Sequence, residues 1–304
     1  MRILVAGLPR GGTTWFSRVV ASAPGVQYIH EPDNRETEPY AAICMPRLRF
    51  QDPIPAKTRL PAYELLWDVA FAGGWPRRPV GVRARRLAMH PKLPGPIAVL
   101  SSTAFARIIR HRRPPTEHQL VKTVRALGTI EWIADRYSPK VIVVWRSPLN
   151  VLGGFGERGW TTSAGGLVRR RFEGTAAGSP PDDPDGNFIW TLCARLGLLL
   201  DTAARHPDWL VVRHEETTQD PAARFRDIFR SIELPWAPEV DAFLESSNVA
   251  GTGWETKRVA SQEATRWKER LSQAQTDTAR DVLARFSELA VVGPVFARCL
   301  AEMD

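Results

Sequence analysis

The sequence predicts an α/β fold in which a parallel central sheet is flanked by helices. Short apolar runs alternate with segments of helical periodicity along much of the 304-residue chain, which is the pattern of strands that helices cover on both faces. The first run, Ile3–Ala6, leads directly into a glycine-rich turn and then into an amphipathic stretch. Hydrophobic residues make up 43% of the chain and charged residues 24%, as in an ordinary folded soluble protein.

The N-terminal part carries two strand signals and one long irregular region. Ile3–Ala6 is expected to be a buried strand, and Thr14–Ser22 is the helix after it, because a proline and a glycine follow soon afterwards. Val26–Ile29 is expected to be a second short strand. From residue 33 to residue 117 prolines recur and the periodicity blurs, apart from a helical stretch near Tyr63–Phe71. We expect an insertion or lid over the sheet there.

Regular periodicity returns in the second half. Gln119–Val124 and Val141–Trp145 are expected strands, with a helix at Gly128–Tyr137 between them. Residues 158–187 are rich in glycine, proline, serine and aspartate, so we expect a mobile loop. The other expected elements are a helix at Phe188–Arg205, a strand at Trp209–Val212 and helices near Ala222–Ile232, Val240–Glu245, Glu263–Leu271 and Thr276–Leu289. Together they are expected to form one domain over residues 1–304.

The turn after the first strand carries the strongest functional signal. Gly7 and Gly12 keep the spacing of a Walker A phosphate-binding loop, G-x-x-x-x-G-K-[ST], and Thr14 fills its hydroxyl position. Thr13 stands in place of the lysine, and the nearest cation is Arg10. The backbone N–H groups of such a loop and the start of the following helix still favour an anion. We therefore expect anion binding, but not the usual binding of a nucleoside triphosphate with magnesium.

The same turn resembles a family motif. Its sequence, Pro9-Arg10-Gly11-Gly12-Thr13-Thr14-Trp15, is similar to the 5′-phosphosulfate loop of sulfotransferases that use 3′-phosphoadenosine 5′-phosphosulfate (PAPS). The resemblance implies a P-loop NTPase-like sulfotransferase fold with PAPS as cosubstrate. It also implies that Arg10, the backbone amides of residues 11–14 and the hydroxyls of Thr13 and Thr14 hold the 5′-phosphosulfate. Trp15 would offer its ring to the adenine, and plain core packing in the first helix is the alternative.

A second segment resembles the family as well. Lys122-Thr123 ends one expected strand and Arg146-Ser147-Pro148 follows the next, like the family's Lys-Thr and Arg-[DNS]-Pro pair. The resemblance implies that Arg146 binds the 3′-phosphate; a surface arginine before a helix is the alternative. Gly154 replaces the hydroxyl that usually shares this phosphate, so backbone N–H groups would have to substitute. Lys122 would steady the transferring sulfuryl group at a strand end, where ligands collect, or be a salt-bridged structural lysine.

The proton acceptor is expected after the second strand. Val124 stands where sulfotransferases of phenols and steroids have a histidine, and valine cannot accept a proton. Carbohydrate and many bacterial sulfotransferases use a glutamate after the second strand, and Glu31 stands at that place. The resemblance makes Glu31 the first choice to deprotonate an acceptor hydroxyl, and the neighbouring His30 the second. A structural role for both residues is the third possibility.

Two later segments resemble the family more thinly. Lys257 and Arg258 are similar to a basic pair that the family places near the 3′-phosphate, without the glycine that usually follows. Arg213-His214-Glu215-Glu216 and Asp220-Pro221 are similar to a segment after a late strand. We interpret this segment as structural, with Glu215 tying down a loop.

Composition limits the remaining classes. The net charge of +8 and the pI of about 9.8 are compatible with an anionic ligand, but the arginine clusters show no nucleic-acid-binding motif. The three cysteines, Cys44, Cys193 and Cys299, have neither disulfide nor zinc spacing. Because PAPS is a polyanion, the resemblance implies a site of cations and N–H donors without a metal. The chain begins with its first strand and has no long apolar window. We therefore expect a cytoplasmic, bacterial protein without a transmembrane anchor.

The sequence as a whole favours an enzyme that moves a sulfuryl group from PAPS to a hydroxyl. The glutamate-type base pattern favours a small-molecule acceptor of the carbohydrate, glycolipid or glycosylated natural-product class. A P-loop kinase is one alternative, although it predicts a lysine where Thr13 stands. A basic nucleic-acid-binding α/β protein is the other, and it predicts salt-sensitive binding to DNA or RNA.

Overall fold

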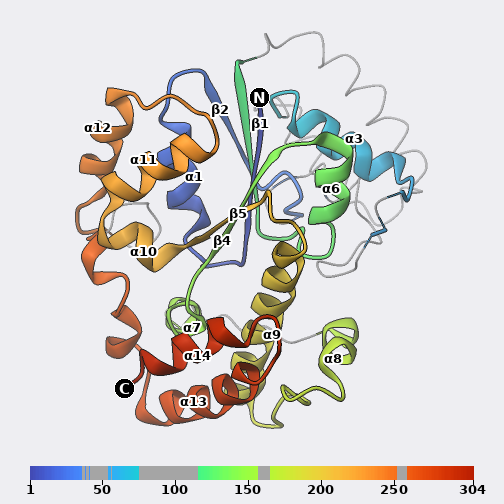
Figure 1. Ribbon diagram of the computed structural model, residues 1–304, viewed down its shortest axis with the longest axis vertical. Helices are drawn as coiled ribbons and strands as arrows, with labels where there is room; N and C mark the ends of the chain where they lie inside the picture. Colours follow the sequence, from blue (N-terminus) through green and yellow to red (C-terminus); the bar gives the residue numbers. More distant parts are fainter. Residues whose placement is uncertain are drawn as a thin grey trace. The chain divides into compact units, whose positions relative to one another are not determined.

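The strands form one sheet. The computed structural model describes residues 1–35, 38, 41, 54–55, 57–74, 116–156, 165–251 and 259–304. Its strands are β1 (Arg2–Gly7), β2 (Val26–His30), β3 (His118–Thr123), β4 (Lys140–Trp145) and β5 (Leu210–Arg213), in the order β2-β3-β1-β4-β5 (Figure 1). The pairs β1–β3, β2–β3 and β4–β5 run parallel. The predicted α/β fold with a parallel sheet and flanking helices is confirmed.

Helices occupy most of the rest of the described chain. They are α1 (Thr13–Ala21), α3 (Pro61–Ala70), α6 (Ile130–Tyr137), α7 (Pro148–Gly156), α8 (Gly166–Phe172), α9 (Pro184–Ala204), α10 (His214–Gln219), α11 (Pro221–Ser231), α12 (Pro238–Ser247), α13 (Gln273–Ser287) and α14 (Gly293–Ala301). The helix expected at Glu263–Leu271 is instead two short 3₁₀ turns, η1 (Ala260–Gln262) and η2 (Arg266–Glu269).

The mobile loop expected at residues 158–187 contains regular structure. Helix α8 lies inside this span, and Val168 and Phe172, four residues apart, are both buried. Helix α9 begins at Pro184, because the side chain of Asp183 accepts a hydrogen bond from the Gly186 amide at 2.6 Å and caps the helix. Asp183 and Pro184, within the span expected to be a loop, therefore start a helix. Residues 157–164 lie outside the described part.

The described chain divides into two compact units. The first unit comprises Met1–Ala6 and Ser17–Val141, and the second comprises Gly7–Phe16 and Ile142–Asp304. The single domain expected over residues 1–304 stays a prediction. The insertion or lid expected at 33–117 lies largely outside the described residues, apart from α3, which matches the helical stretch expected there.

In the first unit the strand register brings the carboxyl ends of β1, β2 and β3 to the same edge of the sheet. Ala6 of β1 pairs with Thr123 of β3, and His30 of β2 pairs with Lys122. Aromatic side chains from α3 and α6 form the core beside this sheet: the rings of Tyr63 and Trp132 lie 5.0 Å apart, centroid to centroid. Residues that follow β2 and β3 are thus neighbours.

The second unit is organised around α9. This helix packs against α7, α8 and α13, and α13 packs against α14. The indole of Trp190 on α9 is buried and contacts the rings of Phe172 and Phe286. The thiols of Cys193 and Cys299 are buried and unbridged, and Cys44 lies outside the described residues.

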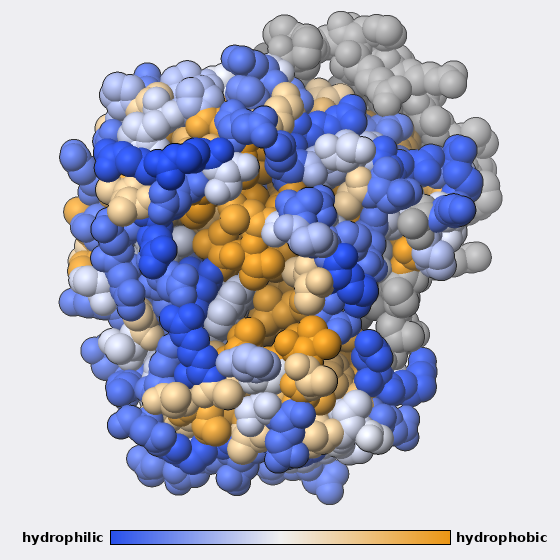
Figure 2. Space-filling model, in the orientation of Figure 1, coloured by the Kyte–Doolittle hydropathy of each residue, from blue (hydrophilic) through white to orange (hydrophobic). Residues whose placement is uncertain are grey.

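Strand β5 ends the strand order and leaves one apolar side chain at the surface. Val211 in its middle is 44% exposed. Figure 2 shows apolar side chains gathered near the middle of the face on which Figure 1 draws β5, within a largely hydrophilic surround.

Candidate functional site

The loop between β1 and α1 has a defined, strained backbone. The Gly11 amide donates to the Leu8 carbonyl at 3.0 Å, and α1 begins at Thr13. Arg10 has a φ of 65° and Gly12 a φ of 81°, both in the left-handed region. For arginine this conformation costs about 1–2 kcal/mol, and such strain persists where the surroundings impose it. The loop therefore has one specific shape at the start of a helix.

His214 of α10 explains why residue 12 has no side chain. A Cβ on Gly12 would lie 1.8 Å from Cδ2 of His214. The imidazole is buried and forms a T-shaped pair with the Trp15 ring, with centroids 5.8 Å apart. Sequence reasoning treated this segment as structural and did not connect His214 with the loop, since nothing local in the sequence links positions so far apart.

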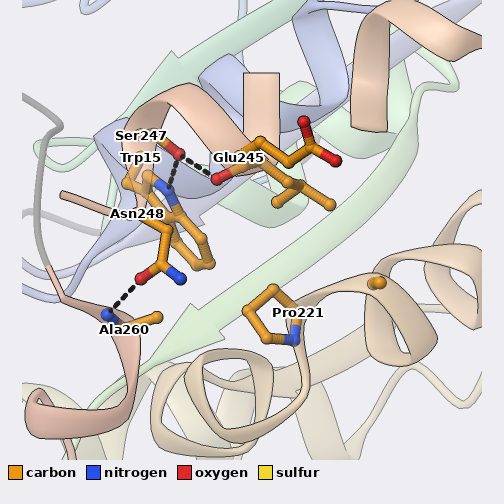
Figure 3. Close-up of a pocket in the computed structure, with 8 residues that line it drawn as sticks. Trp15, Pro221, Glu245, Ser247, Asn248 and Ala260 are labelled. Atoms are coloured by element: carbon orange, nitrogen blue, oxygen red, sulfur yellow. Dashed lines mark hydrogen bonds between the residues drawn. The ribbon is translucent and has the colours of Figure 1, made fainter. Parts of the chain in front are cut away.

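Trp15 packs in the core and also lines a cavity. It is 9% exposed, its Nε1 donates to Ser247 Oγ at 3.2 Å, and its ring lies edge-on to Phe225 at 5.3 Å. The cavity has a volume of about 180 Å³ (Figure 3). Asn248 on its wall accepts a hydrogen bond from the Ala260 amide at 2.9 Å. The cavity is lined by Trp15, Pro221, Ala222, Leu244, Glu245, Ser247, Asn248 and Ala260.

The side chain of Arg10 lies against α7 at Gly154. A Cβ on Gly154 would be 3.2 Å from Arg10 Nε, which is tighter than nine in ten real Cβ contacts. The glycine therefore makes room for the Arg10 guanidinium. Sequence reasoning noted only the hydroxyl that Gly154 lacks, because the approach of Arg10 depends on the fold of the loop.

Arg146, at the end of β4, is buried and paired. It is 3% exposed, so the alternative of a surface arginine is wrong. Its NH2 donates to the Glu263 carboxylate at 2.9 Å and to the Glu263 carbonyl at 3.2 Å. Its NH1 donates to the Arg10 carbonyl at 3.4 Å. Arg146 thus holds the backbone of the loop at its left-handed residue.

Glu215 of α10 fastens the turn between β4 and α7. One carboxylate oxygen accepts from the Ser147 amide and from Asn150 Nδ2, both at 2.9 Å. The other lies 3.4 Å from Arg213 Nε. The prediction that Glu215 ties down a loop is confirmed.

In the first unit, Glu31, His30 and Lys122 come together. Lys122 Nζ donates to Glu31 Oε1, and the two side chains are 2% and 11% exposed. The other carboxylate oxygen of Glu31 accepts from Asn34 Nδ2 at 2.6 Å. His30 Nε2 lies 3.8 Å from the same carboxylate, and its Nδ1 forms a hydrogen bond with the Tyr28 hydroxyl at 2.8 Å.

A left-handed turn places the Glu31 carboxylate. The Glu31 amide extends the β2–β3 ladder by donating to the Lys122 carbonyl at 2.8 Å, and then the chain turns at a φ of 43°. Two of the four non-glycine residues with positive φ in the described chain are thus Arg10 and Glu31. Both are predicted functional residues, and backbone strain of this kind clusters at functional sites.

The charges of this cluster are set by burial and by the ion pair. Burial works to raise the pKa of Glu31, but the Lys122 charge and the hydrogen bonds from Lys122 and Asn34 outweigh it and leave the pKa below its usual value. Burial lowers the pKa of Lys122 against the opposing effect of Glu31. Burial and then the Lys122 charge lower the pKa of His30. At neutral pH Glu31 is ionised and His30 is neutral.

Asp33 is a further buried acid that sequence reasoning did not select. Its Oδ2 accepts from the Thr123 hydroxyl at 2.6 Å, and the Thr123 oxygen accepts from the Arg125 and Ala126 amides. No hydrogen bond from a described residue reaches Asp33 Oδ1. Burial raises the pKa of Asp33 to about 6. Asp33 therefore fixes the turn that follows Lys122 while carrying a buried carboxyl.

Asp33→Asn is expected to change how stability depends on pH. Since the pKa of Asp33 rises from 3.8 to about 6 on folding, the folded protein binds more protons than the unfolded chain in that window, and the free energy of unfolding falls as pH rises through it. The variant keeps an acceptor for Thr123 and loses this ionisation. As the pH rises from 4 to 7, the free energy of unfolding of Asp33→Asn should therefore increase by up to about 3 kcal/mol relative to that of wild type.

Urea unfolding at each pH measures this gain. The control is Asp135→Asn, which removes the same charge from an exposed position on α6 and should keep the wild-type profile. Parallel profiles for Asp33→Asn and wild type would contradict the assignment.

Comparison with known proteins identifies the fold. No protein-family model matches the sequence, and no curated protein matches it significantly. The structure is similar to the crystal structure of mouse sulfotransferase SULT7A1 complexed with PAP, with a TM-score of 0.50 and 10% identity over 98% of this chain and 89% of that chain. The chain has the sulfotransferase fold. The P-loop NTPase-like sulfotransferase fold predicted from the loop is confirmed.

Two sulfotransferase domains give similar matches. The domain from the curacin biosynthetic pathway has a TM-score of 0.49 and 12% identity, covering 95% of this chain and 98% of its own. The domain from the Synechococcus PCC 7002 olefin synthase has a TM-score of 0.43 and 13% identity, covering 92% and 94%. At 10% identity the match to the mouse sulfotransferase shows the fold alone, so function has to be argued from the site.

Some predicted features lie outside what is described. Lys257 and Arg258 fall within residues 252–258, for which no structure is described. Among the described residues, no group of three His, Cys, Asp or Glu side chains is arranged to hold a metal ion. None of the described helices is long and apolar enough to cross a bilayer.

Proposed function

We propose that this protein transfers a sulfuryl group from PAPS to a hydroxyl group of a small-molecule acceptor. The observation that carries the proposal is the β1–α1 loop, whose left-handed Arg10 stands in a phosphate-loop frame that has Thr13 in place of the Walker lysine. The sulfotransferase fold supports the same reading. The products are a sulfate ester and adenosine 3′,5′-bisphosphate.

The second unit offers groups that suit the donor. The first N–H groups of α1 lack partners within the helix and favour an anion. Arg10 can bind two anionic oxygens at once, which lysine cannot. We propose that Arg10, the amides of Gly11, Gly12, Thr13 and Thr14, and the hydroxyls of Thr13 and Thr14 hold the 5′-phosphosulfate.

The cavity beside Trp15 is the proposed adenine site. A volume of about 180 Å³ is adequate for a purine base, and the wall combines an aromatic ring with the polar side chains of Ser247 and Asn248. The ring belongs to Trp15 of α1, directly after Thr14 of the proposed phosphosulfate site, so the two sites are adjacent along the chain. For the 3′-phosphate we propose Arg146 with the basic pair Lys257 and Arg258.

The first unit offers groups for proton transfer. Sulfuryl transfer forms a bond from the acceptor oxygen to sulfur and breaks the bond from sulfur to the bridging oxygen of the donor, while the hydroxyl proton must leave. We propose Glu31 as the proton acceptor, since it is ionised, with His30 as the second candidate. Lys122 supplies a positive charge for the transferring group. Its strand, β3, pairs with β1, whose carboxyl end leads into the loop.

The acceptor class is inferred from the base. A glutamate after the second strand is the pattern of sulfotransferases that act on carbohydrates, in the resemblance described above. We therefore propose a carbohydrate, glycolipid or glycosylated natural product as the acceptor.

Calorimetric titration with adenosine 3′,5′-bisphosphate, without metal, tests the donor assignment. Wild type is expected to bind in the micromolar range. Arg10→Ala should weaken binding about 10- to 100-fold, because a hydrogen-bonded charge is lost from the anion. The matched control is Arg170→Ala, which removes the same charge from an exposed position on α8 and should bind like wild type.

Three outcomes would contradict the donor assignment. If Arg10→Ala and wild type bound adenosine 3′,5′-bisphosphate equally well, Arg10 would not contact the nucleotide. A requirement for magnesium with preference for ATP would favour a P-loop kinase. Salt-sensitive binding to DNA or RNA without nucleotide binding would favour a nucleic-acid-binding protein.

A further inference from the structure

Five charged side chains of alternating sign form a chain in the second unit, four of them buried and the last, Arg266, 34% exposed. Arg213 Nε lies 3.4 Å from Glu215, and Glu215 lies 4.0 Å from Arg146 Nε. Arg146 NH2 lies 2.9 Å from Glu263 Oε2, and Glu263 Oε1 lies 2.5 Å from Arg266 NH1. The residues come from β5, α10, the end of β4, the end of η1 and η2, so the chain forms only in the folded unit.

This buried charge chain already neutralises Arg146. Glu263 is 1% exposed and Arg146 is 3% exposed, so water screens their interaction poorly. Glu302 adds a third carboxylate, 2.6 Å from Arg213 NH2. Glu302 also lies 3.7 Å from Arg298 Nε, so it is shared between two arginines.

The Glu263 carboxylate holds the part of Arg146 that a phosphate would need. NH2 donates to both the carboxylate and the carbonyl of Glu263, and NH1 donates to the Arg10 carbonyl. A carboxylate and a phosphate bind guanidinium in the same bidentate manner. An incoming 3′-phosphate must therefore either displace Glu263 from Arg146 or bind without a contact to Arg146.

We propose that Glu263 is a specificity-determining residue: an internal anion that competes with the 3′-phosphate for Arg146 and reduces what this phosphate adds to nucleotide binding. In this proposal the main role of Arg146 is to position the backbone of the β1–α1 loop through its hydrogen bond to the Arg10 carbonyl. The inference rests on the proposed function, because it concerns the nucleotide that the loop binds.

Two nucleotides that differ only in the 3′-phosphate test the proposal. The dissociation constants of adenosine 5′-monophosphate and adenosine 3′,5′-bisphosphate are measured by calorimetry, and their ratio reports the value of the 3′-phosphate. In wild type we expect a ratio below about 10, less than one charge-assisted contact normally gives. In Glu263→Gln the ratio should rise about tenfold or more through tighter binding of the bisphosphate alone.

The control variant removes an equal charge from Glu302, a more exposed carboxylate at the Arg213 end of the buried charge chain. Glu302→Gln takes a carboxylate from Arg213 and leaves the Arg146–Glu263 contact in place, so its ratio should match wild type. A second variant, Glu263→Asp, keeps the charge and withdraws it by one methylene, and should give an intermediate ratio. Circular dichroism and thermal denaturation establish that each variant is folded.

The outcomes separate this inference from the proposed function. A wild-type ratio of about 100 or more would overturn the inference even if no Glu263 variant folds. An unchanged ratio in folded Glu263→Gln would also overturn it, and the donor assignment would stand. If wild type bound neither nucleotide, the proposed function would fail and the inference with it.

Discussion

Glu31→Gln is expected to destabilise the protein by about 3–5 kcal/mol at neutral pH, because it leaves the Lys122 ammonium buried without its counter-ion. The Lys122 side chain is 2% exposed and the Glu31 side chain 11%. Glutamine keeps the size of the side chain and an oxygen that can accept from Asn34 or Lys122. The loss therefore reports the charge, and urea unfolding at pH 7 measures it.

The double variant Glu31→Gln/Lys122→Met separates structural from catalytic roles. Removing both charges should recover most of the lost stability, because no unpaired charge then remains buried. Equal losses in the single and double variants would show that the two charges are not coupled.

The rate of sulfuryl transfer should not recover in the double variant as stability does. If Glu31 is the proton acceptor, both the single and the double variant should lose about 100- to 10,000-fold in transfer rate. The assay uses PAPS with a panel of carbohydrate acceptors and follows release of adenosine 3′,5′-bisphosphate. A stable double variant with restored transfer would exclude Glu31 as the base. Loss of transfer in His30→Gln alone would favour the second candidate.

Gly12→Ala is expected to destabilise the protein by about 2–4 kcal/mol and to abolish nucleotide binding. The methyl group adds the cost of a left-handed alanine to an overlap with a buried ring. The φ of Gly12 is 81°, and its Cβ would lie 1.8 Å from His214 Cδ2. Either the loop or the imidazole must move, and both support the proposed donor site.

The control for this variant is another glycine. Gly156→Ala adds a methyl group at the exposed end of α7, where no atom of the described residues lies within 4 Å, and should change stability by less than about 1 kcal/mol. Gly12→Ala/His214→Ala should recover part of the binding by opening space. Wild-type nucleotide binding by Gly12→Ala would show that the described loop shape is not required.

The local elements of the proposed site could be predicted from the sequence. An apolar run followed by spaced glycines predicted β1, the loop and the start of α1, because each pattern lies within a short stretch of chain. The position of Glu31 after β2 followed from the same kind of reading. Prediction failed at α8, where two buried residues outweigh a surrounding composition typical of loops.

The sequence by itself determined which residues follow the strand ends and that the loop has arginine but no Walker lysine. Only the tertiary structure decided what those residues contact. Lys122 meets Glu31 across 91 positions and Arg146 meets Glu263 across 117, while His214 closes on Gly12. Strand register and burial create these contacts. A buried charge pairs with the opposite charge that the fold places near it, and no local sequence pattern predicts which residue that is.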